Sequence, residues 1–286
     1  MKKTVLSLLV SATVMFSLNA FAAAEPLSKE KEFENKVNAM GLYEKFGGIQ
    51  VMRNLGEFGL PDLYEVKIGG RDYGVMPSSG THFITGEVVH FVKDKQPQNI
   101  TAEYKAKLLA VNAKKEVESL KEADFISYAP KGEKVGTLYV FTDTTCGYCV
   151  KLHNEVEQYV AAGVEVKYVP YPRSGVEEKV PVAQNPDGSL KYGENEALTH
   201  LAQTMCAKDK GLALTEFKRQ VAGLKYDTPD YQQRKAECIS YVKEGYVAGQ
   251  KIGFNGTPFL YLSTGEVIPG YNPAAQVIDK LKAGKK

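Results

Sequence analysis

The pattern of apolar and polar positions is clearest in the middle of the chain. Residues 137–141 form a run rich in β-branched and aromatic side chains, which is typical of a buried strand. Apolar positions then recur at near-helical spacing from residue 150 to residue 160, and residues 164–169 again have the pattern of a strand. This order of strand, helix and strand predicts a βαβ unit with a right-handed crossover and two parallel strands.

The rest of the C-terminal half predicts more helices and a second pair of strands. Apolar repeats over residues 194–252 indicate a mainly helical insertion. Residues 259–268 then read as a β-hairpin with a short central turn, and Asn272-Pro273 marks the start of a last helix that ends near Gly284.

The N-terminal third has a different pattern. Residues 27–43 carry one apolar stripe, which predicts a short amphipathic helix. Residues 64–68 alternate, Gly69-Gly70 turns the chain, and further short strands follow as far as Val92. This α+β unit has few apolar residues and would expose a sheet edge, which is a site for pairing with another chain. We therefore interpret residues 25–95 as a homodimerisation domain.

Residues 96–133 separate this unit from the C-terminal domain, which we assign to residues 134–286. Pro97 and Thr101 give a helix start signal, and sparse apolar positions follow among many Lys and Glu. We interpret the segment as a linker helix that touches little and acts as a rigid spacer. The alternative is an ordinary surface helix packed on one domain.

The N terminus has the features of a secretory signal. Two lysines precede an apolar run over residues 5–18 that is shorter than a bilayer span, and several alanines follow. We assign residues 1–24 as a cleavable signal peptide, with cleavage after Ala22 or Ala24 equally compatible with the pattern.

Composition excludes some partners. The 36 basic and 34 acidic residues give a formal charge of +2, and removal of the two lysines of the signal segment leaves 34 against 34. A nearly neutral chain without a basic block argues against nucleic acid and against an anionic membrane surface as partners. Cleavage of 24 of the 286 residues leaves 262, enough for two domains.

Cys146 and Cys149 carry the candidate chemistry, because they stand where the strand over residues 137–141 turns into a helix. The first N–H groups of a helix lack internal partners, and their partial positive charge stabilises an anion. A thiol at this place is more acidic than a free cysteine, so we assign Cys146 as the attacking sulfur. Cys149 follows one turn later and can reach back, so we assign it as the resolving sulfur.

Two structural interpretations of this C-x-x-C pair are disfavoured. Zinc normally needs four ligands, and the sequence offers neither a second close cysteine pair nor a histidine pair, so we expect no metal. A purely structural disulfide in so short a ring would remove little entropy from the unfolded chain.

The four cysteines are an even number in a chain that carries an export signal, which suggests oxidising surroundings. Three pairings are possible. The spacing favours Cys146 with Cys149, which leaves Cys206 and Cys238 to close a long loop and to contribute roughly 3.5 to 4 kcal/mol on the chain-entropy model. We interpret this second pair as structural, with a redox role as the alternative.

Several motifs together resemble one known family. They are F-T-D at 141–143, T-C-G-Y-C at 145–149, K-L-H at 151–153, Y-P-R at 171–173, C-A-K-D-K at 206–210, G-T-P at 256–258 and P-G-Y at 269–271. Over residues 134–286 the chain resembles the DsbC/DsbG family of bacterial periplasmic disulfide isomerases, and the N-terminal third resembles it in length and plan. The resemblance implies an α+β protein with an N-terminal cystatin-like dimerisation domain, a linker helix and a C-terminal thioredoxin-like domain with a helical insertion.

The resemblance also implies a cis peptide bond between Thr257 and Pro258, opposite the two cysteines. The backbone N–H and C=O of Thr257 would then stay unpaired, so that a substrate peptide could add as a short strand beside Cys146. The hydroxyl of Thr257 is expected near Cys146, where it can tune the thiol. The structural pairing of Cys206 with Cys238 is implied as well.

Other residues around the cysteines carry weaker expectations. Thr145 and Asp143 are expected to shape the strand-to-helix turn. Gly147 and Tyr148 form the dipeptide that modulates reduction potential in this superfamily, and Tyr148 offers a flat contact for substrate. We expect His153 to be an exposed helical residue; the alternative is that it raises the positive character near the thiolate.

One segment departs from the family. Residues 174–193 form a polar, turn-rich loop that is longer than usual. We interpret it as a flexible surface loop. The alternative is that it lines the substrate cleft.

The sequence and the resemblance together predict a periplasmic disulfide isomerase that reshuffles wrong disulfides in misfolded secreted proteins. It would act as a homodimer, use no cofactor beyond its own cysteine pair, and be kept reduced by a membrane thiol reductant of the DsbD kind. The alternatives are a thiol oxidase or reductase of the same superfamily, or a chaperone that holds unfolded chains without chemistry. The N-terminal meander and the spacer favour the isomerase, because a monomeric oxidase would need neither.

Overall fold

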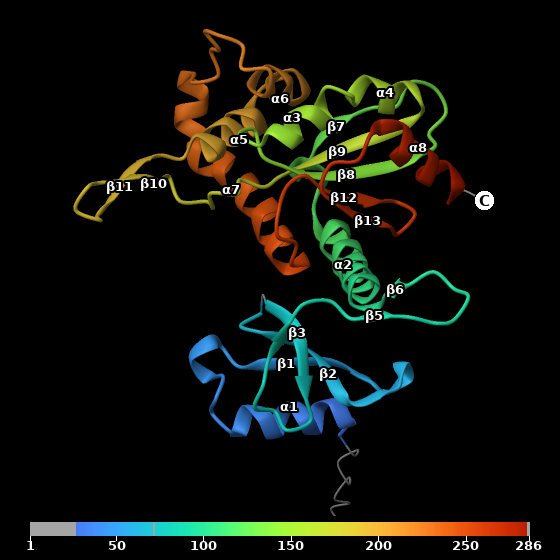
Figure 1. Ribbon diagram of the computed structural model, residues 1–286. Coiled ribbons are helices and arrows are strands. Elements are labelled where there is room, and N and C mark those ends of the chain that lie inside the picture. Colours follow the sequence, from blue (N-terminus) through green and yellow to red (C-terminus); the bar gives the residue numbers. More distant parts are fainter. Residues whose placement is uncertain (1–26, 71, 285–286) are drawn as a thin grey trace, which may run out of the picture. The chain divides into compact units, whose positions relative to one another are not determined.

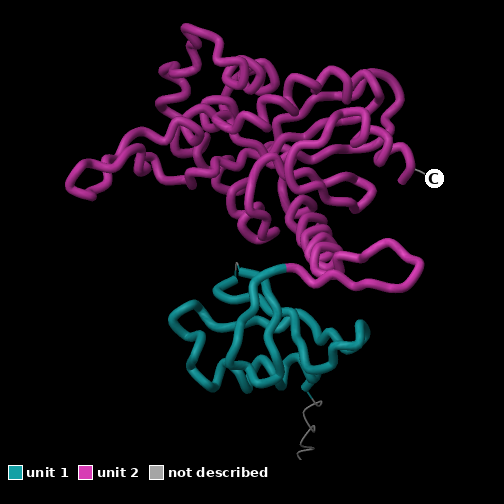
Figure 2. Tube along the Cα trace, in the orientation of Figure 1, with its two compact units in different colours: residues 1–86 teal, residues 87–286 magenta. Residues whose placement is uncertain are grey.

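The computed structural model describes residues 27–70 and 72–284 in two compact units, residues 1–86 and residues 87–286 (Figure 2). The predicted signal peptide, residues 1–24, lies outside the described residues. Within the described part of the chain, no helix combines the length and the apolar character needed to cross a membrane.

The first unit packs one helix on a four-stranded antiparallel sheet of order β1-β2-β3-β4. Its elements are α1 (Lys29–Ala39), η1 (Glu44–Phe46), β1 (Ile49–Leu55), η2 (Gly56–Phe58), β2 (Leu60–Ile68), β3 (Asp72–Pro77) and β4 (Ile84–Thr85). The predicted helix and meander are therefore present. Strand β1 was not expected, because its middle positions are all half-buried and show no clear alternation.

The core of the first unit is small. Its main cluster has six buried side chains: Phe33, Val37, Ile49, Val66, Ile68 and Met76. Leu55 and Val75 are buried as well. Phe33 of α1 also stacks on Tyr64 of β2, with 4.0 Å between ring centroids. The apolar stripe predicted for the helix is only partly buried, because Leu27 and Met40 at its ends are exposed.

The second unit is built on a five-stranded mixed sheet of order β13-β12-β8-β9-β7 (Figure 1). Its strands are β7 (Ile126–Tyr128), β8 (Gly136–Thr142), β9 (Val164–Pro170), β12 (Phe259–Leu262) and β13 (Val267–Pro269). Strands β8 and β9 are parallel and are joined by α3 (Gly147–His153) and α4 (Val156–Ala161), which confirms the βαβ unit. The hairpin of β12 and β13 is confirmed as well.

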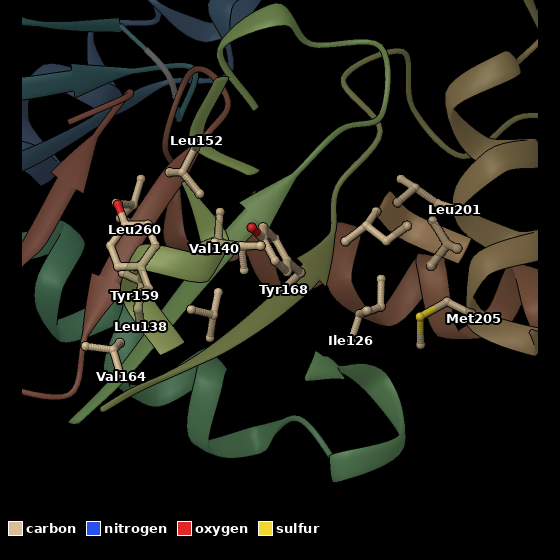
Figure 3. Packing of buried hydrophobic residues seen from close by; sticks show 14 of the residues in the cluster. Ile126, Leu138, Val140, Leu152, Tyr159, Val164, Tyr168, Leu201, Met205 and Leu260 are labelled. Carbon is tan, nitrogen blue, oxygen red and sulfur yellow. The ribbon is translucent and has the colours of Figure 1, made fainter. Parts of the chain in front are cut away.

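Both faces of this sheet are buried because side chains alternate along each strand. Along β8, Leu138 and Val140 join one core, whereas Phe141 joins the other. The first core contains side chains of α3, α4, α8 (Ala274–Ala283) and the inserted helices (Figure 3). The second core contains the ends of α2 (Ile100–Ser119) and α7 (Pro229–Ile252). Strand β8, which leads to the cysteines, therefore packs against a hydrophobic core on each face.

The linker expectation needs correction. The helix is α2, and it ends at Ser119 rather than near residue 133. Its buried residues Ala113 and Val117 belong to a core of the second unit, so the helix is packed against that unit rather than standing free as a spacer. Beyond it, η3 (Glu122–Asp124) leads into β7, which pairs with β9. Before it, β5 (Val89–His90) pairs with β6 (Gln98–Asn99).

The insertion between β9 and β12 is helical, as predicted, and begins with a hairpin. Its elements are β10 (Lys179–Gln184), β11 (Leu190–Glu194), α5 (Glu196–Cys206), α6 (Lys210–Lys218) and α7. A disulfide joins Cys206 to Cys238 on α7, with 5.6 Å between their Cα atoms, and confirms the predicted pairing. Gly245 of α7 lies against the end of β9, where an added Cβ would be 2.4 Å from the carbonyl oxygen of Pro170.

Candidate active site

Cys146 lies where β8 gives way to α3, as the sequence predicted. It is the N-cap residue of α3, with φ −88° and ψ 116°, and its carbonyl accepts the first helical hydrogen bond from Val150 N–H at 3.0 Å. Its side chain is only 4% exposed, but Thr145, Gly147 and Tyr148 around it are all exposed. The sulfur therefore lies just beneath a surface that its chain neighbours form.

The two sulfurs have opposite acidities. A hydrogen bond from the Cys149 thiol is the largest cause that lowers the pKa of Cys146 to about 5, with smaller contributions from the Thr257 hydroxyl, the Cys149 backbone and the charge of Arg173. Cys149 is fully buried, and burial followed by its bond to Cys146 raises its pKa. At neutral pH Cys146 is the thiolate and Cys149 is the thiol, which fits the predicted roles of attacking and resolving sulfur.

The peptide bond between Thr257 and Pro258 is cis, as the family resemblance implied. It brings the Thr257 carbonyl to 3.3 Å from Cys146 Sγ, where it accepts a hydrogen bond from the protonated thiol. The expectation that this carbonyl stays unpaired is therefore wrong for the protonated state. Ionisation of Cys146 removes the donor and frees the carbonyl.

Asp143 holds the turn that precedes Cys146. Its buried carboxylate accepts hydrogen bonds from the backbone N–H and hydroxyl of Thr145, both at 2.7 Å. Its other oxygen accepts from Arg173 N–H at 2.9 Å and from Arg173 Nε at 3.1 Å. The bonds to Thr145 close the strand-to-helix turn as expected. The motif at residues 171–173 did not indicate that Arg173 would be the other partner.

His153 is not an exposed helical residue, and that expectation is wrong. It is 1% exposed, and its two ring nitrogens lie 3.0 Å from Tyr168 Oη and 3.0 Å from Thr215 Oγ1. Burial lowers the pKa of His153 to about 3, so the ring is neutral and cannot add positive charge near Cys146. The cause is α6, which carries Thr215 and packs over this face of α3.

Lys218 is a residue near the cysteines that sequence reasoning missed. It is the last residue of α6 and only 2% exposed. Its ammonium donates to Thr142 Oγ1 at 2.9 Å and to the Asp143 carbonyl at 3.2 Å. The available signal was its position four residues after Leu214, on the apolar stripe of a helix.

The segment expected to be a flexible loop is largely a hairpin. Strands β10 and β11 pair in antiparallel register, and the ribbon projects from the rest of the second unit (Figure 1). Its base reaches a cavity of about 570 Å³, which Glu194 lines together with Thr144, Thr145 and His200. The base of the hairpin and the active-site turn therefore line the same cavity.

The Tyr148 side chain is available for contact, because it is 64% exposed. Among residues 27–70 and 72–284, no group of three or more His, Cys, Asp or Glu side chains has an arrangement that could hold a metal ion.

Comparison with known proteins gives a consistent result. Residues 121–285 match the family described as "Thioredoxin-like domain". The chain is 30% identical over 219 residues to the thiol:disulfide interchange protein DsbC of Escherichia coli K12, covering 74% of this chain and 77% of that protein. It is 29% identical to DsbC of Dickeya dadantii, covering 82% and 87%.

A solved structure shows a more distant likeness. The disulfide interchange protein from Neisseria gonorrhoeae is 24% identical, with a TM-score of 0.41, over 58% of this chain and 99% of that one.

The acidity of Cys146 can be measured directly. In the reduced protein, the rate of alkylation of Cys146 by iodoacetamide should reach half its plateau near pH 5 and stay flat through pH 7, because the thiolate is the reacting species. The change Cys149→Ala removes the main stabilising hydrogen bond, so the midpoint should move to higher pH. A wild-type midpoint near that of an ordinary cysteine, about 8.5, would contradict this assignment.

Proposed function

Because the chain belongs to the DsbC family of thiol:disulfide interchange proteins and carries its thioredoxin-like domain, we propose that it is a periplasmic disulfide isomerase for misfolded secreted proteins. It is a thiol:disulfide oxidoreductase in the broad sense. The observation that carries the proposal is the placement of Cys146 at the start of α3, with its sulfur at the cis Thr257-Pro258 turn and the buried Cys149 behind it.

The reaction begins with the Cys146 thiolate, which attacks one sulfur of a wrong disulfide. A bond forms between Cys146 Sγ and that sulfur, the client disulfide breaks, and the second client sulfur leaves as a thiolate. This thiolate attacks another disulfide of the client, and a client thiolate finally displaces Cys146. Cys146 leaves as it began, so the client is rearranged with no net oxidation or reduction.

Cys149 provides the exit from intermediates that do not rearrange. Its thiolate attacks Cys146, releases the client sulfur as a thiolate, and leaves a disulfide between Cys146 and Cys149. The client has then been reduced by two electrons. The protein must regain them, and we propose a membrane thiol reductant of the DsbD kind as the donor.

The turn at Thr257 supports recognition of extended chains. The Thr257 carbonyl lies at the sulfur, and Asn255 and Gly256 before it are exposed. A client segment laid along this turn as a short strand would present its disulfide to Cys146.

The first unit supports a role as a homodimerisation domain of cystatin-like plan. Its core is small for an independent domain, and Leu42, Phe46 and Ile84 are each at least half exposed. Pairing of two copies would cover such side chains and place two active sites in one assembly.

A second activity, holding unfolded chains without chemistry, is favoured by the hairpin of β10 and β11. Val182, Leu190 and Tyr192 are each more than half exposed on this ribbon. The base of the ribbon and the active-site turn line the same cavity, so apolar client segments could rest on the ribbon while their sulfurs react.

The isomerase assignment is tested with scrambled ribonuclease. Cys146→Ala should reduce reshuffling to the uncatalysed rate, because it removes the attacking sulfur. Cys149→Ala should keep part of the activity and accumulate clients joined to Cys146, because only the exit is lost. The two variants are matched controls for each other. Retained activity in Cys146→Ala would refute the assignment.

The dimer proposal is tested by sedimentation of the mature protein at micromolar concentration. We expect twice the mass of one mature chain, since association buries the exposed apolar side chains of the first unit. A single-chain mass throughout a dilution series would contradict the proposal.

The holding proposal is tested in the Cys146→Ala, Cys149→Ala background, which has no chemistry. This protein should still suppress aggregation of a reduced, unfolded client. Adding Val182→Ser, Leu190→Ser and Tyr192→Ser should weaken the suppression several-fold, because the apolar contact is lost. A matched control places serine at Val111, Leu212 and Val247, which are also exposed in the second unit. Equal loss in both sets would exclude a specific role of the hairpin.

A further inference from the structure

Lys218 is a buried cation at the back of the active site. It donates two hydrogen bonds, to Thr142 Oγ1 and the Asp143 carbonyl, and both acceptors are formally neutral. An ammonium has three N–H donors, so one remains beyond these two. Among the described residues no carboxylate lies within ion-pair distance of Lys218 Nζ. The carboxylate of Asp143 is bonded instead to Thr145 and Arg173.

Burial of an uncompensated ammonium is unfavourable, because the group loses its hydration. A buried lysine is stabilised when a neighbouring acid loses its proton, so the acids around Lys218 indicate its role. The acids that interact with Lys218 are Cys149, Asp143 and Cys146, with Cys149 the strongest after burial itself. The Asp143 carbonyl accepts from Lys218 Nζ at 3.2 Å and from Cys146 N–H at 3.4 Å, so the ammonium lies at the turn from which α3 begins. The Asp143 backbone also lowers the pKa of Cys149, one turn further along α3.

The other groups around Cys149 offer no comparable charge. His153 on α3 is neutral and engaged with Tyr168 and Thr215. Tyr168 on β9 is fully buried and stays a phenol, because burial raises its pKa. The Arg173 side chain is bonded to the Asp143 carboxylate and half exposed, so water screens its charge, which acts on Cys146 more than on Cys149.

We propose that Lys218 is a positioning residue for the resolving step: its ammonium is the counter-ion of the Cys149 thiolate. This inference rests on the proposed function, because it concerns the exit from the mixed disulfide. Once Cys146 is joined to a client, Cys149 loses its proton to water and its thiolate faces Lys218. The thiolate attacks Cys146 Sγ, a Cys146–Cys149 bond forms, and the bond from Cys146 to the client breaks. Cys149 is oxidised, and the client sulfur leaves reduced and takes up a proton from water.

The test separates the two sulfurs with an aromatic disulfide, 5,5′-dithiobis(2-nitrobenzoate). Reduced protein releases one thionitrobenzoate when Cys146 attacks and a second when Cys149 resolves the mixed disulfide. Stopped-flow absorbance therefore reports the two steps as separate phases. The proteins are wild type, Lys218→Met, Lys218→Gln and the control Lys225→Met, which removes an exposed lysine beyond the same helix.

In Lys218→Met and Lys218→Gln the second phase should slow by about tenfold at pH 7, and its pH midpoint should rise by about one unit, since one pKa unit is a tenfold change in the ratio of thiolate to thiol. The first phase should change by less than about threefold, and Lys225→Met should behave as wild type. Resistance of Lys218→Met to denaturant should be unchanged or higher, because a buried charge has been replaced by an apolar side chain of similar length.

Two results would overturn the inference. One is a second phase in both Lys218 variants that matches wild type at every pH. The other is equal slowing of both phases together with lower stability, which indicates a structural role. Absence of the first phase in the wild type would instead refute the proposed function, so the two failures are distinguishable.

Discussion

The structure of the active site depends on the burial of one carboxylate, that of Asp143. A buried carboxylate is tolerated only when hydrogen bonds replace the water that it loses. Asp143 obtains them from Thr145, at the start of the active-site turn, and from Arg173, just beyond β9. Its backbone carbonyl meanwhile accepts from Cys146 N–H and from Lys218. One residue thus fixes the turn that presents Cys146 and connects it to the parallel strand and to the inserted helix α6.

The same geometry makes two chemically identical side chains unequal. Cys146 stands at the end of the helix, where hydrogen-bond donors converge on it and a cation lies nearby, whereas Cys149 lies one turn deeper with its sulfur surrounded by protein. The hydrogen bond between them stabilises the anion on the outer sulfur and the proton on the inner one. The difference in acidity between the two thiols therefore follows from three residues of spacing.

The sequence was sufficient where the deciding contacts are local. The strand before Cys146, the helix after it and the hairpin after Pro258 all follow from short-range periodicity, and the family resemblance supplied the cis bond. Prediction from the sequence failed where the deciding contact comes from a residue far along the chain. His153 is buried by Thr215, which lies 62 residues later, and Lys218 reaches back 76 residues to Thr142. Strand β7 was not predicted, because its three residues become a strand only by pairing with β9.

The distant contacts of Thr215 and Lys218 both come from one segment of the insertion, and the disulfide between Cys206 and Cys238 closes that segment. Helix α6, with Thr215 and Lys218, lies inside it. A buried polar group favours any local opening of the fold that would hydrate it. The Lys218 ammonium favours such opening more than the Thr215 hydroxyl does, because an ammonium is strongly hydrated. A cross-link that closes the loop reduces the conformations open to that segment, and on the chain-entropy model it destabilises the fully unfolded chain by roughly 3.5 to 4 kcal/mol. The disulfide between Cys206 and Cys238 therefore closes the loop that carries Lys218 to the active-site turn.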